Sequence, residues 1–123
     1  MKRSILMAVA VCAATVGAQS SGTAFADARR FEWNGTWAMN HDGWRGQLSI
    51  LANNHVHYRD AKGQLRHGRV VSVTDRNQRM RFYIDFSNHR QYFNAYIFSW
   101  DKKKMAGTTV WNGRTFGMYA LKR

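Results

Sequence analysis

Cysteine and long apolar runs are both scarce in this chain of 123 residues. The only cysteine is Cys12, and it lies in residues 1–26, which have a positively charged start, a short apolar run and an Ala-Phe-Ala tripeptide at residues 24–26. The apolar run is too short to act as a stable membrane anchor. These features are typical of a secretory signal, so we expect cleavage after residue 26 and an exported protein of bacterial type, periplasmic or secreted.

The mature chain, residues 27–123, would then contain no cysteine and form no disulfide. An exported domain without disulfides is held together by its core alone, which fits a bacterial periplasmic or secreted protein better than a disulfide-stapled extracellular module. Its length suits a single domain with one core. All five tryptophans and all five tyrosines lie in this region, so we expect aromatic side chains to fill that core.

Acidic residues are also few. Residues 27–123 contain 17 basic and 7 acidic residues, a net charge of +10. Such a charge predicts attraction to polyanions such as nucleic acid, acidic polysaccharide or lipid headgroups. An inhibitor of a cationic enzyme should itself be acidic, so an inhibitor or immunity protein of this composition would have to act on an acidic protein partner.

Signatures of catalysis are missing as well. The mature chain has no carboxylate pair, nucleophile elbow or phosphate-binding loop, and we expect no cofactor. One enzymatic alternative is a small ribonuclease-like hydrolase, in which two side chains exchange protons across a phosphodiester. Its candidate residues are His41, Asp42, His57, His89 and several lysines.

What the mature chain does contain is a regular alternation of residue types. From Phe31 to Met39 every second residue is apolar or small, and the alternation resumes from Trp44 to Ile50 after the turn-forming residues 40–43. A period of two is the mark of a strand with one buried face. This stretch therefore predicts a β-hairpin.

The same pattern predicts eight strands and no helix in the mature chain, joined by short turns such as Asn112-Gly113. The fourth strand needs a β-bulge near Gly68, which would turn His67 outward while Leu65 or Val71 stays in. The expected strands cover residues 31–39, 44–51, 55–58, 64–74, 80–86, 91–100, 105–111 and 114–121.

Eight sequential antiparallel strands describe an up-and-down meander, and closing it into a barrel removes its two exposed edges. We therefore predict an all-β fold, an antiparallel up-and-down eight-stranded barrel. Its interior is either filled by side chains or holds one small ligand. A sandwich of two four-stranded sheets is the alternative that the same pattern permits.

Gly35-Thr36-Trp37 is a Gly-x-Trp motif on the first strand of a small secreted β protein. It resembles the opening signature of the calycins, which include the lipocalin and avidin-like barrels. The resemblance implies an eight-stranded barrel in which Trp37 lies at the closed end, near a basic residue of the last strand, here Arg114 or Lys122. It implies no biotin binding, because the full set of biotin-binding polar residues is not matched in this chain.

Histidines suggest a possible metal site on neighbouring strands. His55 and His57 share a face of the third strand, and His67 joins them if the bulge turns it outward. Two histidines at i and i+2 with a third from the next strand suit zinc or copper. The alternative is a polar outer face that holds no metal and whose charge changes near pH 6 to 7.

These observations favour an exported binding protein over an enzyme. Its ligand is either a small molecule in the barrel mouth or an anionic envelope component on a basic outer face. The predicted lining of the mouth is Trp33, Trp37, Trp44, Tyr58, Phe82, Tyr96 and Trp111. The predicted anion-binding residues are Arg45, Arg81, Arg90, Lys102, Lys103, Lys104 and Arg114.

Overall fold

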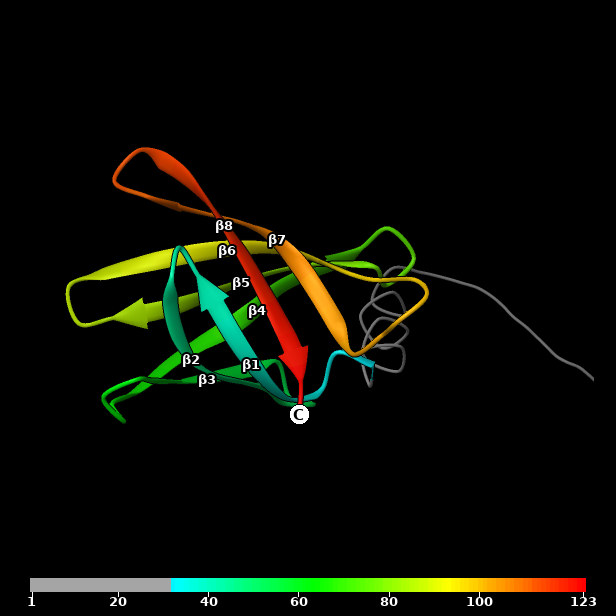
Figure 1. Ribbon diagram of the computed structural model, residues 1–123, viewed down its shortest axis with the longest axis horizontal. Coiled ribbons are helices and arrows are strands. Elements are labelled where there is room, and N and C mark those ends of the chain that lie inside the picture. Colours follow the sequence, from blue (N-terminus) through cyan, green and yellow to red (C-terminus); the bar gives the residue numbers. More distant parts are fainter. Residues whose placement is uncertain (1–31) are drawn as a thin grey trace, which may run out of the picture.

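The computed structural model describes residues 32–123 (Figure 1). The predicted signal, its cleavage site and Phe31 lie outside the described residues. No helix long and apolar enough to cross a membrane occurs in the described range. Eight strands follow one another: β1 (Gly35–His41), β2 (Trp44–Ile50), β3 (His55–Asp60), β4 (Leu65–Thr74), β5 (Arg79–Phe86), β6 (His89–Ile97), β7 (Lys104–Trp111) and β8 (Arg114–Lys122).

The sheet closes on itself. Each strand pairs antiparallel with the next, and β8 returns to pair with β1. The β1–β8 ladder runs from Trp37 opposite Lys122 to His41 opposite Met118. The predicted up-and-down barrel is therefore confirmed, and the sandwich alternative is wrong, because closure leaves neither the first nor the last strand as a free edge.

The inward faces of the strands fill the middle of the barrel. On β5, Met80, Phe82 and Ile84 have no exposed surface, as their alternation predicted. Phe82 stacks on Phe93 of β6, with ring centroids 5.0 Å apart. Burying side chains of this size removes enough apolar surface from water to hold a small domain together without disulfides.

The two ends of the barrel are built differently. The β1–β2, β3–β4, β5–β6 and β7–β8 turns lie at one end, here called the hairpin end, and the remaining connections lie at the other (Figure 1). The β1–β2 turn is tighter than predicted, since only Asp42 and Gly43 form it and His41 stays in the strand. Both turn residues have positive φ (53° and 87°), as have Asn112 and Gly113. Turns of this kind match the strand twist.

At the opposite end, the chain before β1 folds across the barrel. The first strand therefore begins at Gly35, four residues later than predicted. Trp33 lies in a turn with no exposed surface, and its indole Nε1 donates a hydrogen bond to the carbonyl oxygen of Asn77 (2.8 Å). The indole of Trp37 donates in turn to the carbonyl oxygen of Trp33 (2.9 Å). This arrangement closes the end of the barrel.

A basic residue of the last strand lies against this closed end, as the resemblance to calycins implied. Lys122 Nζ is 5.4 Å from the centre of the Trp37 ring and donates a hydrogen bond to the carbonyl oxygen of Glu32 (2.9 Å). Burial lowers the pKa of Lys122, and the Glu32 carboxylate partly offsets that effect. Arg114, the other candidate, lies at the opposite end of β8.

The bulge predicted near Gly68 is wrong in position. Pairing is continuous through Gly68 on both sides, and the register shifts only after Val70. Gly68 instead allows the backbones of β4 and β5 to approach closely, because a Cβ at this position would lie 1.8 Å from the carbonyl oxygen of Tyr83. Neither Leu65 nor Val71 stays in the core, since both are exposed.

We expect Gly68→Ala to destabilise the barrel by about 2 kcal/mol or more, because the methyl group forces the backbones of β4 and β5 apart. Gly117→Ala is the matched control, since a Cβ at Gly117 meets no atom within 4 Å. Its effect should stay within about 0.5 kcal/mol. Urea unfolding of both variants measures the difference, and equal stabilities would contradict the close approach at Gly68.

Candidate functional site

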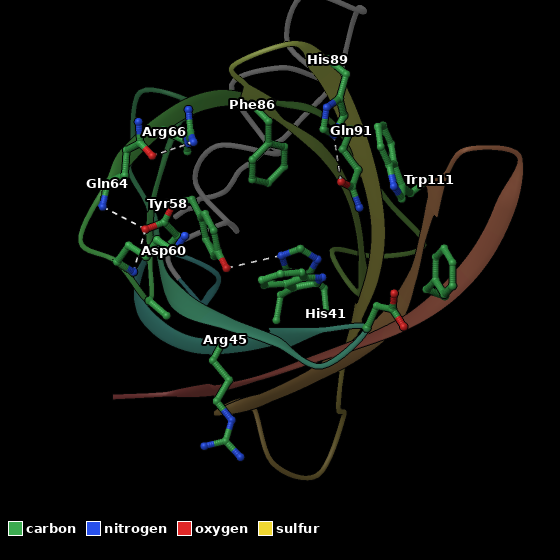
Figure 2. Close-up of a pocket in the computed structure, with 15 residues that line it drawn as sticks. His41, Arg45, Tyr58, Asp60, Gln64, Arg66, Phe86, His89, Gln91 and Trp111 are labelled. Carbon is green, nitrogen blue, oxygen red and sulfur yellow. Dashed lines mark hydrogen bonds between the residues drawn. The ribbon is translucent and has the colours of Figure 1, made fainter.

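A cavity of about 390 Å³ opens at the hairpin end of the barrel (Figure 2). Inward-facing residues of the strands form its floor, which includes His41 of β1, Tyr58 of β3 and Gln91 of β6. The His41 ring packs against Phe93, with centroids 5.4 Å apart and planes nearly perpendicular. The cavity is therefore the end of the barrel interior that the packed core does not fill.

The floor is a pair of neutral polar rings. Tyr58 Oη lies 3.4 Å from His41 Nε2, and the tautomer of the imidazole decides which of the two donates. Burial lowers the pKa of His41 below its ordinary 6.5, and Asp42 partly offsets this. Burial, with a smaller contribution from Asp60, raises the pKa of Tyr58 to about 12. Gly46 leaves room for the phenol, since a Cβ there would lie 2.3 Å from the Tyr58 ring.

Aromatic rings form much of the wall. Phe86 is in edge contact with Tyr58 (6.0 Å between centroids) and stacks on His89 (5.2 Å). His89 in turn lies 3.9 Å from the Trp111 ring. These rings converge on the cavity in Figure 2, and Trp44 and Phe116 complete the aromatic lining. Such a wall offers flat apolar surfaces against which another ring could pack.

Arg66, one of the cations that line the cavity, forms no ion pair with an acidic residue among residues 32–123. The guanidinium carbon of Arg66 lies 5.9 Å from the centre of the Phe86 ring, and Nη2 donates a hydrogen bond to the side-chain oxygen of Gln64 (2.9 Å). Arg66 Nε is buried and has no hydrogen-bond partner among residues 32–123, and none of the ion pairs within that range involves Arg66. Asp60, nearby in Figure 2, instead accepts the backbone N–H groups of Lys62 and Gln64.

The predicted lining residues fall into three places. Trp44, Tyr58 and Trp111 line the cavity. Trp33, Trp37 and Phe82 have no exposed surface and belong to the core. Tyr96 is about half exposed, on the outer face of β6, with the guanidinium of Arg79 5.8 Å from its ring. Only the first three can touch a ligand in the cavity, and their binding role stays a prediction.

The predicted anion-binding residues do not form one patch. Arg45 lies beside the cavity, but its side chain points away from it (Figure 2). Arg81 and Arg90 stack on Tyr92 and Tyr83 of the outer β5–β6 face, at 4.6 and 3.8 Å.

The other predicted cations lie nearer the two ends. Arg114 begins β8 at the hairpin end, whereas Lys104 begins β7 at the opposite end, with Lys102 and Lys103 just before it. The basic surface is therefore spread around the barrel.

Two of the three histidines predicted as metal ligands, His57 and His67, lie together. His57 and His67 lie directly opposite each other, with ring centroids 5.0 Å apart, while His55 lies opposite Arg69. Among the described residues, no group of three His, Cys, Asp or Glu side chains is placed to hold a metal ion.

Several residues of the cavity were not predicted from the sequence, among them Arg66 and Gln91. Gln91 donates a hydrogen bond to Thr109 Oγ1 (2.8 Å), whose hydroxyl donates to the carbonyl oxygen of Tyr92. The alternation of the strands could have identified both residues. Arg66 is two residues from Gly68 and four from Val70 on the inward face of β4, and Gln91 is two residues from Phe93 on the inward face of β6. A polar residue on an inward face near a strand end indicates an open barrel mouth.

No protein-family model matches the chain, and no curated protein is similar to it at a significant level. The resemblance to calycins therefore rests on the Gly35-Thr36-Trp37 motif, on the barrel topology and on the contact between Trp37 and Lys122.

We expect the stability of the protein to fall as the pH drops below about 6.5. The pKa of His41 is lowered by folding, so the unfolded chain binds the proton more readily, and the stabilisation present above pH 6.5 is lost below it. Urea unfolding between pH 7.5 and roughly 5.5 should show this loss, and His41→Gln should reduce it. A His41 titration midpoint at or above 6.5 by NMR would contradict the burial argument.

Proposed function

We propose that this protein is an exported, calycin-like binding protein that takes a small, flat, anionic molecule into the hairpin end of its barrel. The observation that carries the proposal is the 390 Å³ cavity, lined by aromatic rings and by Arg66, which pairs with no acidic residue in the described part of the chain. Its volume lies within the range of roughly 300 to 1,000 Å³ that is typical of small-molecule sites.

The aromatic wall supports a flat ligand. Phe86, His89 and Trp111 form a continuous series of ring contacts along one side of the cavity. Trp44 and Tyr58 stand on other strands around the same space. Rings arranged in this way bury a planar molecule on its faces and edges, which favours aromatic or otherwise flat ligands over compact ones.

Arg66 supports a negative charge on the ligand. A planar guanidinium forms paired hydrogen bonds with carboxylate, sulfonate or phosphate oxygens. The Arg66 guanidinium lies over the Phe86 ring, 5.9 Å from its centre, so one anionic group could accept hydrogen bonds from it while the rest of the ligand lies against the aromatic wall. His41 and Tyr58, both neutral at pH 7, would offer hydrogen bonds at the floor.

A pair of fluorescent probes tests this proposal. Anilinonaphthalene sulfonate and its uncharged analogue N-phenylnaphthylamine share their rings and differ in the sulfonate. We expect Arg66→Gln to weaken sulfonate binding by about tenfold, because a hydrogen bond to a charged group contributes about 1.5 kcal/mol or more. Binding of the uncharged probe should change little.

Arg69→Gln is the matched control, because Arg69 is on the same strand, carries the same charge and faces outward. Trp111→Ala should weaken both probes. Equal loss of the sulfonate probe in the Arg66 and Arg69 variants would refute a role for Arg66, and unchanged binding of both probes in Trp111→Ala would place them outside the cavity.

A second candidate function is hydrolysis of a phosphodiester. It is favoured by the presence of His41 and His89 in the same cavity as Arg66, since two imidazoles and a cation are the groups that such a reaction uses. The two histidine rings lie on either side of Phe86, 6.2 and 5.2 Å from its centre.

If this second function is real, the protein should cleave short RNA, and His41→Gln or His89→Gln should each lower the rate by about 100-fold or more. Product analysis by mass spectrometry, with the double variant as the control for contaminating nucleases, measures this. Cleavage that persists in the double variant would rule the reaction out.

A further inference from the structure

The connection between β6 and β7, at the end of the barrel away from the cavity, carries an unusual tryptophan. Trp100 is 99% exposed, more than any other large apolar side chain in the described part of the chain. Phe98, two residues earlier, is about half exposed. A fully exposed indole gains nothing from folding, so it does not serve the core.

Other exposed apolar side chains lie on the strands beside this connection. Tyr96, Ala106 and Tyr119 lie side by side on β6, β7 and β8, and both tyrosines are about half exposed. Two residues further along the chain from each tyrosine, Phe98 and Leu121 lie on either side of Lys104. The backbone N–H of Phe98 donates to the carbonyl oxygen of Lys104, and Lys104 is paired with the half-exposed Leu121 on β8. The apolar members of this surface, here called the tip patch, are Tyr96, Phe98, Trp100, Tyr119 and Leu121.

Cations frame the tip patch. Lys102, Lys103 and Lys104 directly follow Trp100 and Asp101, and the guanidinium of Arg79 lies 5.8 Å from the Tyr96 ring. Lys102 pairs with Glu32 at 3.7 Å and Lys104 with Asp101 at 3.6 Å, and all four of these side chains remain partly exposed. Four cations against two acids leave the patch positively charged.

We propose that the tip patch docks on the surface of an anionic lipid bilayer, with Trp100 at the level of the headgroups and the lysines against the anionic lipids. Tryptophan and tyrosine favour the interface between headgroups and hydrocarbon, where an apolar ring can be buried and its polar edge stays wet. Lysine stems lie along apolar surface while their charged ends reach the headgroups.

Charge decides against a second copy of the chain as the occupant. Residues 32–123 contain 15 basic and 6 acidic residues, a net charge of +9, so two tip patches facing each other would repel. A bilayer rich in anionic lipid provides the complementary charge, and docking there would leave the cavity at the opposite end open to the aqueous phase.

Flotation with lipid vesicles tests the proposal. The exported protein, purified with its N-terminus determined by mass spectrometry, is mixed with vesicles of phosphatidylglycerol and phosphatidylcholine or of phosphatidylcholine alone. We expect binding to the anionic vesicles only, with a blue shift of tryptophan fluorescence. Trp100→Ser should weaken binding by about tenfold or more and abolish the shift.

The basic frame is tested by replacing Lys102, Lys103 and Lys104 together by glutamine. Each lysine is expected to contribute about fivefold to the affinity for anionic vesicles, so the triple variant should bind on the order of 100-fold more weakly. The matched control replaces three cations elsewhere on the barrel, Arg59, Arg69 and Arg114, and should lose far less. Circular dichroism of each variant verifies that the barrel is intact.

Three results would overturn the proposal. The first is binding of Trp100→Ser to anionic vesicles as tight as that of the unaltered protein. The second is an equal loss of binding in the two triple variants, which would indicate unspecific charge attraction. The third is a Trp100-dependent dimer in analytical ultracentrifugation without vesicle binding, which would make the patch an interface between copies. None of these outcomes bears on ligand binding at the hairpin end.

Discussion

The pairing of β1 with β8 is the interaction on which the rest of this structure depends. It joins residues about 80 positions apart in the sequence, from Trp37 opposite Lys122 to His41 opposite Met118. Without it, the same eight strands would form an open sheet with unpaired backbone groups along two edge strands and no enclosed interior. The ladder also places one feature of the interior at each of its ends: the contact of Trp37 with Lys122 at the closed end, and His41 beneath the cavity.

Closure by itself does not decide which end of the barrel is open. That difference comes from the connections, because turns as short as Asp42-Gly43 cannot fold over the mouth, whereas the residues before β1 bring Trp33 across the other end. The interior is therefore polarised along its axis. Large apolar rings fill the closed half, and polar groups such as Gln91 and Arg66 lie where the space opens to solvent.

Much of the fold could be predicted from the sequence, because alternation reports directly which residues share a face. The eight strands and the inward row of β5 follow from it. The start of β1 and the position of the bulge did not, since both depend on which neighbour approaches closely: Trp33 turns toward Asn77, and Gly68 meets the backbone of Tyr83. Local pattern carries no information about such distant contacts.

The sequence by itself determined an aromatic-rich, disulfide-free domain of alternating strands with a surplus of positive charge. Only the tertiary structure decided that Tyr58 and Trp111 share a cavity with Arg66, that Phe82 lies in the core, and that Trp100 is almost fully exposed to solvent. The physical reason is that alternation gives the face of the sheet on which a side chain lies, but not its height along the barrel. Height follows from the stagger of neighbouring strands, which is settled when the sheet closes.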